Sequence, residues 1–167
     1  RVGVANQTTM LKSETEEVQR RLKQAILDRD GPQAEKQNFQ VFDTICGATQ
    51  ERQDALFEML RKPMDLLLVV GGYNSSNTAH LVEMAEPQLP TFFIRGASCI
   101  KSLEEIVHYD LHRREEITSN YARLFSSDHP VTVGITAGAS CPNNLIEETI
   151  FKVFELRGVD HDQLEGI

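Results

Sequence analysis

The sequence contains no tryptophan and only three cysteines in 167 residues. The cysteines, Cys46, Cys99 and Cys141, are odd in number, far apart and without a Cys-x-x-Cys pair. This pattern excludes the disulfide framework of a small secreted protein and suits a reducing cytosol or organelle stroma. Each cysteine is by default expected to be a small buried apolar residue.

Long apolar runs and an excess of basic charge are also missing. No run approaches the roughly 18 to 20 residues of a membrane-spanning helix. The 17 basic residues are outnumbered by 25 acidic ones, so the formal net charge is −8. Nucleic acid would require a basic surface facing its phosphates. We therefore expect neither a membrane nor nucleic acid as a partner.

The composition that is present, 40% hydrophobic and 25% charged residues, is ordinary for a globular protein. One domain, or one and a half, is expected at this length. The first residue is Arg1, and the residues after it are typical of an interior strand. We therefore expect the chain to be a piece of a longer protein.

Hydrophobic periodicity predicts strands that alternate with helices, which indicates an α/β fold with a parallel sheet. The predicted strands are residues 2–5, 39–42, 65–70, 91–94 and 131–135. The predicted helices are residues 13–30, 50–61, 77–86, 102–108, 113–125 and 142–156. Ser13 and Glu16 form a predicted capping box, Gly31 and Pro32 end that first helix, and residues 33–38 are expected to form a loop.

A cluster of small polar residues follows the most apolar strand. Residues 71–77, Gly-Gly-Tyr-Asn-Ser-Ser-Asn, lie between that strand and the next helix. A helix N-terminus exposes N–H groups and the positive end of its dipole, and Ser75, Ser76 and Asn77 add neutral donors there. The turn is expected either to hold a phosphate or diphosphate or only to cap the helix. Because Gly-x-Gly-x-x-Gly and Gly-Lys-Ser/Thr are absent, a compact anion is favoured over a nucleotide.

Two further polar turns, residues 44–49 and 136–140, are expected at the sheet edge where parallel α/β proteins bind ligands. Ser140 would add a hydroxyl there. Cys46 lies just ahead of a predicted helix, where the dipole favours the thiolate, and is the candidate soft metal ligand. A lone cysteine cannot hold a cluster, so its other ligands would have to come from elsewhere.

The histidines carry a weaker signal. His108 and His112 are four residues apart, a spacing that could place both on one helix face, as in zinc sites. No His-Glu-x-x-His motif and no third ligand accompany them, so a solvated polar face is the favoured interpretation. No Ser-His-Asp arrangement can be proposed from the spacing.

Four motifs occur together and in order across nearly the whole chain. They are residues 5–10 (Ala-Asn-Gln-Thr-Thr-Met), 44–53 (Thr-Ile-Cys-Gly-Ala-Thr-Gln-Glu-Arg-Gln), 69–77 and 134–142. This set resembles the 4-hydroxy-3-methylbut-2-enyl diphosphate reductase family, also called LytB. The versions at residues 8–10 and 50–54 resemble its plant and cyanobacterial branch.

The resemblance implies an iron–sulfur oxidoreductase of isoprenoid biosynthesis. Its members remove the hydroxyl of an allylic diphosphate substrate with two electrons and protons, in the last step of the methylerythritol phosphate pathway. The products are isopentenyl and dimethylallyl diphosphate. The family binds a 4Fe–4S cluster through three cysteines, one from each of three α/β lobes, and takes electrons from ferredoxin or flavodoxin. A bacterial cytoplasm or a plastid stroma is the expected location.

Site residues follow from the resemblance position by position. Cys46 matches one of the three cluster cysteines, and Thr49 matches a threonine beside the cluster. Thr8 matches a catalytic threonine near the substrate hydroxyl, where it can help to order proton delivery. Ser75, Asn77 and Ser140 match positions that bind the substrate diphosphate in the family, and Ser76 lies in the same turn as the first two.

The resemblance also implies a lobe organisation. Residues 1–38 would end the middle lobe, residues 39–157 would form the third lobe, and residues 158–167 would be an acidic tail. The other cluster cysteines, the diphosphate-binding histidines and the catalytic glutamate belong to the family's earlier half. The N-terminal half of the same protein is therefore an expected partner, and this chain is expected to be inactive alone.

Some positions depart from the family pattern. Cys99 and Cys141 lie outside the cluster motifs, and Cys141 is expected to be a cap or packing residue. Residues 95–110 match poorly. The residues leave open two alternatives to this reductase. The first is a metal-free α/β enzyme or binding module for a phosphorylated metabolite, and the second is a structural or regulatory remnant without activity.

Overall fold

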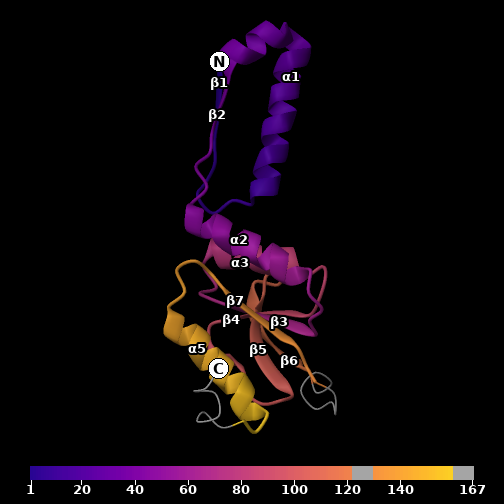
Figure 1. Ribbon diagram of the computed structural model, residues 1–167, viewed down its shortest axis with the longest axis vertical. Coiled ribbons are helices and arrows are strands. Elements are labelled where there is room, and N and C mark those ends of the chain that lie inside the picture. Colours follow the sequence, from indigo (N-terminus) through magenta and orange to yellow (C-terminus); the bar gives the residue numbers. More distant parts are fainter. Residues whose placement is uncertain (122–129, 160–167) are drawn as a thin grey trace. The chain divides into compact units, whose positions relative to one another are not determined.

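A computed structural model describes residues 1–121 and 130–159 of the chain (Figure 1). The fold divides into two compact units, Arg1–Gln53 and Asp54–Ile167. The expected α/β class with parallel sheets is confirmed. The expected lobe boundary after residue 38 concerns the longer protein and stays a prediction. Within the described ranges, no helix combines the length and the apolarity that crossing a membrane requires.

The first unit is a parallel βαβ arrangement. Strands β1 (Val2–Ala5) and β2 (Phe39–Phe42) pair in register from Val2 opposite Phe39 to Ala5 opposite Phe42. Two parallel strands need a long crossover between them, and helix α1 (Lys12–Asn38) provides it. The predicted strands at residues 2–5 and 39–42 are thus confirmed.

Helix α1 differs from its prediction at both ends. It begins after Leu11, and no side chain caps it, so the predicted capping box at Ser13 is wrong. Gly31, with a φ of 78°, interrupts the helix, but helical residues resume at Pro32 and continue to Asn38. The predicted loop at residues 33–38 is therefore also wrong. Proline is tolerated in the first turn of a helix, so Gly31 and Pro32 kink α1 instead of ending it.

The second unit is built on a three-stranded parallel sheet with the order β4-β3-β7. Its strands are β4 (Thr91–Ile94), β3 (Leu66–Val70) and β7 (Val133–Ala137). Its helices are α3 (Ser76–Ala85) and α5 (Asn143–Leu156), together with the C-terminal part of α2 (Gly47–Leu60). Every residue of the central strand β3 is buried, as a near-continuous apolar run predicts.

Side chains of β3 alternate between two apolar layers, because successive residues of a strand point to opposite faces. Leu67 and Val69 lie in one cluster with Leu56 of α2 and Leu81 of α3. The other layer contains Leu66, Leu68 and Val70, and α5 packs against it. Helices therefore cover both faces of the sheet, which leaves the carboxyl ends of the strands as the edge where sheets of this kind bind ligands.

Residues 102–108 and 113–125 do not form the predicted helices. Strands β5 (Glu105–Asp110) and β6 (Glu115–Asn120) pair there as an antiparallel hairpin, with Arg114 in the turn at a φ of 59°. β-Branched residues favour a strand, and they occupy both arms at residues 106–107 and 117–118. The part of the second prediction that falls on residues 122–125 lies outside the described residues. A short 3₁₀ turn, η1 (Ala97–Cys99), precedes the hairpin.

His108 gives this hairpin a pH-dependent stability. Its ring packs edge-on against Phe92, with centroids 5.0 Å apart, and its Nε2 lies 2.8 Å from Ser119 Oγ. Burial lowers the pKa of His108 from its ordinary value of 6.5. Because the folded pKa lies below the unfolded one, this stabilisation is present above pH 6.5 and is lost as pH falls through the folded pKa.

We expect the unfolding temperature of the protein that contains this chain to fall when pH is lowered from about 7 to about 5. His108→Gln cannot be protonated, so it should remove part of that fall. Differential scanning calorimetry at a series of pH values measures both slopes. Equal slopes for the variant and the parent would contradict the assignment to His108.

Candidate functional site

The residues around Cys46 are brought together by backbone hydrogen bonds within the first unit. The Cys46 N–H donates to the Thr8 carbonyl at 2.9 Å, which joins the segment after β1 to the segment after β2. Thr44 Oγ1 accepts from the Asn6 N–H at 2.7 Å and donates to the Asn6 carbonyl at 2.6 Å. The two predicted site residues Thr8 and Cys46 are thus adjacent.

Cys46 occupies the N-cap position of α2. It directly precedes the helix, and its carbonyl accepts the first helical bond from the Gln50 N–H at 3.0 Å. Its thiol is free and exposed. Thr49 follows in the first turn and is only 3% exposed. An exposed thiol at the positive end of a helix suits a thiolate ligand for a soft metal.

Cys46 is the one such ligand that the described residues offer at this place. Within residues 1–121 and 130–159, no group of three or more His, Cys, Asp and Glu side chains could hold a metal ion. A 4Fe–4S cluster is held by cysteine thiolates. The donor chemistry of Cys46 therefore fits one cysteine ligand of such a cluster.

The polar turn in the second unit lies where β3 ends and α3 begins. Ser75 is the N-cap of α3, and its Oγ accepts from the Thr78 N–H at 3.3 Å. Ser76 is exposed in the first helical turn. The predicted helix and its predicted N-cap are confirmed. A helix cap is also the alternative to an anion site that the sequence left open. A feature beyond a plain cap is needed to favour a ligand.

Asn77 supplies that feature. Its side-chain Oδ1 accepts from the Ala139 N–H at 2.7 Å, in the turn that follows β7. A backbone N–H can only donate, so this bond identifies the oxygen of the amide and leaves Nδ2 as the other end. Asn77 is 5% exposed, and its Nδ2 is buried without a hydrogen-bond partner among residues 1–121 and 130–159. An unpaired buried amide donor is costly, and a bound acceptor would satisfy it.

The same Asn77–Ala139 bond brings Ser140 toward α3. Ser140 is exposed and follows Ala139 directly. Three of the predicted diphosphate residues therefore lie at the N-terminus of α3, and the fourth lies in the turn to which Asn77 is bonded. The structure divides the predicted residues into two groups, one in each unit.

Two glycines allow the turns after β3 and β7 to approach α3 closely. A Cβ at Gly71 would lie 2.5 Å from Thr78 Oγ1, and a Cβ at Gly138 would lie 2.1 Å from the same atom. Thr78 is 1% exposed. The sequence predictions missed Thr78 because only its close packing against Gly71 and Gly138 distinguishes it from an ordinary helical threonine.

The remaining candidates of the sequence lie elsewhere. His108 is in β5 and His112 is in the hairpin turn region, so the predicted shared helix face is wrong. Cys99 is 7% exposed in the apolar core, and its Sγ lies 3.8 Å from the Tyr73 hydroxyl. Cys141 is half-buried and packs against that core, as expected of a packing residue.

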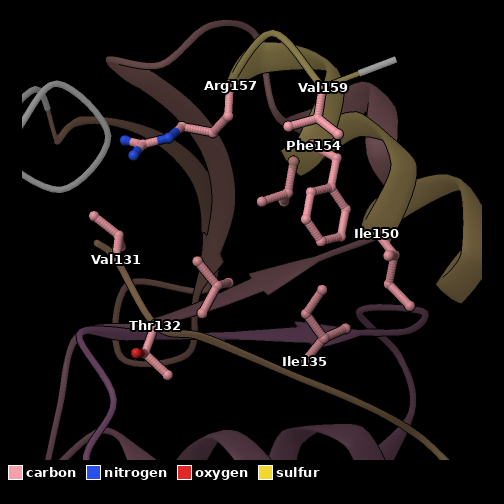
Figure 2. A pocket seen from close by; sticks show the side chains of 9 residues that line it. Val131, Thr132, Ile135, Ile150, Phe154, Arg157 and Val159 are labelled. Atoms are coloured by element: carbon pink, nitrogen blue, oxygen red, sulfur yellow. The ribbon is translucent and has the colours of Figure 1, made fainter. Parts of the chain in front are cut away.

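A groove between β7 and α5 has a volume of about 480 Å³. Figure 2 shows Ile135 on its floor and Phe154 and Ile150 of α5 above it. Its walls are mainly apolar, with Arg157 at one end. None of the predicted site residues lines this groove, and an apolar surface does not suit an anion.

The fold and these two groups define an α/β protein. Neutral hydrogen-bond donors lie at the N-terminus of α3, and an exposed thiol lies at the N-terminus of α2. A family model described as "LytB protein" matches residues 1–154. The chain belongs to the LytB family.

Curated relatives agree with this membership. The chain is 48% identical to the 4-hydroxy-3-methylbut-2-enyl diphosphate reductase of Gloeobacter violaceus over 99% of its own length and 39% of the relative's. It is 44% identical to the chloroplastic enzyme of the same name from Botryococcus braunii, over 94% of this chain and 32% of that one. The chain thus spans well under half the length of these relatives.

The fold has a solved counterpart as well. The structure titled as the E-1-hydroxy-2-methyl-but-2-enyl-4-diphosphate reductase from Plasmodium falciparum matches with a TM-score of 0.63. The match covers 94% of this chain and 41% of the other at 20% identity. At this identity the likeness shows a shared fold.

The close packing of Gly138 on Thr78 gives a testable stability difference. Gly138→Ala should destabilise the protein by about 1–3 kcal/mol, because the new methyl group overpacks a buried contact. Gly47→Ala is the matched control, since a Cβ there meets nothing within 4 Å. Urea denaturation of the protein that contains this chain measures both. Equal stability of the two variants would contradict the close approach.

Proposed function

We propose that the longer protein containing this chain reduces 4-hydroxy-3-methylbut-2-enyl diphosphate to isopentenyl and dimethylallyl diphosphate. This reaction is the last step of the methylerythritol phosphate pathway of isoprenoid biosynthesis. In it the allylic C–O bond breaks, the oxygen leaves as water, and the carbon skeleton gains a hydrogen. Two electrons and two protons balance the change. The relatives' names and the unpaired Asn77 amide support this proposal together.

Asn77 is the observation in this chain that carries the proposal. Its orientation is set by the Ala139 N–H, so its buried Nδ2 is presented as a donor before any ligand arrives. The Ser75 and Ser76 hydroxyls and the helix dipole act at the same point. Ser140 adds a hydroxyl from the turn after β7. Neutral donors of this kind suit the diphosphate of the substrate.

The chain's part in redox chemistry is assigned to Cys46. We propose that its thiolate is one of three cysteine ligands of a 4Fe–4S cluster, whose other two ligands lie in the N-terminal half of the same protein. When bound, the cluster supplies electron transfer and a Lewis-acidic iron. Thr8, joined to Cys46 through its backbone, offers an exposed hydroxyl that can hold a proton for the departing oxygen. Thr49 packs in the helical turn that follows Cys46.

The electron donor and the location follow the same proposal. Ferredoxin or flavodoxin would supply the two electrons. A bacterial cytoplasm or a plastid stroma would be the compartment, which the cyanobacterial and chloroplastic names of the relatives support.

The role of Cys46 is tested by iron content. In the complete protein, purified without oxygen, Cys46→Ser should lose most of about four iron and four sulfide per chain. Cys141→Ser is the control, because the Cys141 thiol donates to the carbonyl of its neighbour Pro142 at 3.7 Å and lies in a different unit. Iron and acid-labile sulfide analysis reads out both. Full iron in Cys46→Ser would contradict the proposal, and an active parent without iron would favour a metal-free enzyme.

The anion site is tested by binding. Ser75→Ala and Asn77→Ala should each weaken binding of inorganic diphosphate by roughly 10- to 150-fold, because each removes a charge-assisted hydrogen bond of about 1.5 to 3 kcal/mol. Ser102→Ala is the matched control, since Ser102 Oγ also accepts from a nearby backbone N–H, that of Glu104 at 3.1 Å. Isothermal titration calorimetry of the complete protein measures the affinities. Unchanged affinity in both site variants would overturn the anion site.

A further inference from the structure

Thr78 makes two hydrogen bonds to the same oxygen atom. Its backbone N–H donates to Ser75 Oγ at 3.3 Å, and its own Oγ1 lies 2.9 Å from that Ser75 Oγ. The first bond is the usual capping contact from the third helical residue to the N-cap side chain. The second is additional. In a capping box the side chain of that third residue would bond the backbone of the cap instead.

Hydrogen counting decides the direction of the second bond. Thr78 is 1% exposed, and among the described residues Ser75 Oγ is the only hydrogen-bond partner of its hydroxyl. If Ser75 donated, the Thr78 hydroxyl hydrogen would be buried without an acceptor, which is costly. Thr78 therefore donates to Ser75. A serine oxygen has two acceptor lone pairs, and Thr78 occupies both.

We propose that Thr78 is a positioning residue that makes Ser75 an obligate hydrogen-bond donor toward a diphosphate. With both lone pairs of Ser75 occupied, its own hydroxyl hydrogen is left to point away from Thr78, toward the open side of the turn. The inference rests on the proposed anion site and deepens it. Thr78 need not touch the ligand; it selects which end of the Ser75 hydroxyl the ligand meets.

The packing around Thr78 holds its hydroxyl in this role. Gly71 and Gly138 lie so close that a Cβ on either would fall within 2.5 Å of Thr78 Oγ1. This close packing fixes the place of Thr78 Oγ1 beside Ser75 Oγ, where its hydroxyl donates. A donor that is oriented before binding costs no reorganisation when the anion arrives.

Two substitutions at residue 78 separate the hydroxyl from the rest of the side chain. Thr78→Ser and Thr78→Ala both lose the methyl group, and they differ by one oxygen atom. Inorganic diphosphate should bind the complete protein carrying Thr78→Ser within about twofold of the parent. It should bind Thr78→Ala roughly five- to tenfold more weakly, as loss of one oriented neutral hydrogen bond predicts.

A matched pair at Thr149 controls for the loss of any buried helical hydroxyl. Thr149 is fully buried in α5, and its Oγ1 donates to the Leu145 carbonyl at 2.7 Å. Thr149→Ser and Thr149→Ala should bind diphosphate alike. Thermal unfolding of all four variants shows which remain folded, and affinities are compared among those.

A double-substitution cycle tests whether Thr78 acts through Ser75. In a Ser75→Ala background there is no hydroxyl to orient, so adding Thr78→Ala should cause no further loss of diphosphate affinity. Independent effects that multiply would show that Thr78 acts in another way and would overturn the inference. Equal binding by folded Thr78→Ser and Thr78→Ala would overturn it as well.

The same titrations separate this inference from the proposed function. A parent protein that does not bind inorganic diphosphate would contradict the anion site itself, and the role of Thr78 with it. A parent that binds, with Ser75→Ala weakened and Thr78→Ala unchanged, would keep the anion site and remove only the role of Thr78.

Discussion

The hydrogen bond from the Ala139 N–H to Asn77 Oδ1 is the interaction on which the anion site depends. It ties the turn after β7 to the first turn of α3, and it orients the Asn77 amide so that Nδ2 is left as a buried donor. The two strand ends can approach α3 only because Gly71 and Gly138 have no side chain where Thr78 lies. Packing between distant segments thus prepares a set of neutral donors for an anion.

Much of the fold follows from local pattern. The apolar run at residues 65–70 predicts the buried central strand, and the glycine and polar residues after it predict the turn and the N-cap at Ser75. The sequence predicts helices at residues 102–108 and 113–125, because the polar character of this segment hides the two-residue alternation of β5 and β6. The hairpin is held by cross-strand pairs and by contacts such as the stacking of Tyr109 on Tyr73, with centroids 4.7 Å apart. Such tertiary contacts cannot be read from the local pattern.

The candidate site was predictable in its residues and not in its hydrogen bonds. Ser75, Asn77 and Cys46 could be named from their positions between a strand and a helix. The direction of the Asn77 amide depends on Ala139, which lies 62 positions away. The double contact of Thr78 with Ser75 is local, but Gly138 from the turn after β7 packs against it. Cys46 is a different case, because one exposed thiol gives the type of ligand without the rest of the set.

A crystal structure of the complete protein, grown without oxygen in the presence of inorganic diphosphate, tests the central claim most directly. The account predicts phosphate oxygens within about 3 Å of Ser75 Oγ and Asn77 Nδ2, and an iron atom bound to Cys46 Sγ. Diphosphate bound elsewhere, with Asn77 Nδ2 still unpaired, would contradict the account of the anion site. A Cys46 thiol without iron in a fully active crystal would contradict the assignment of the cluster.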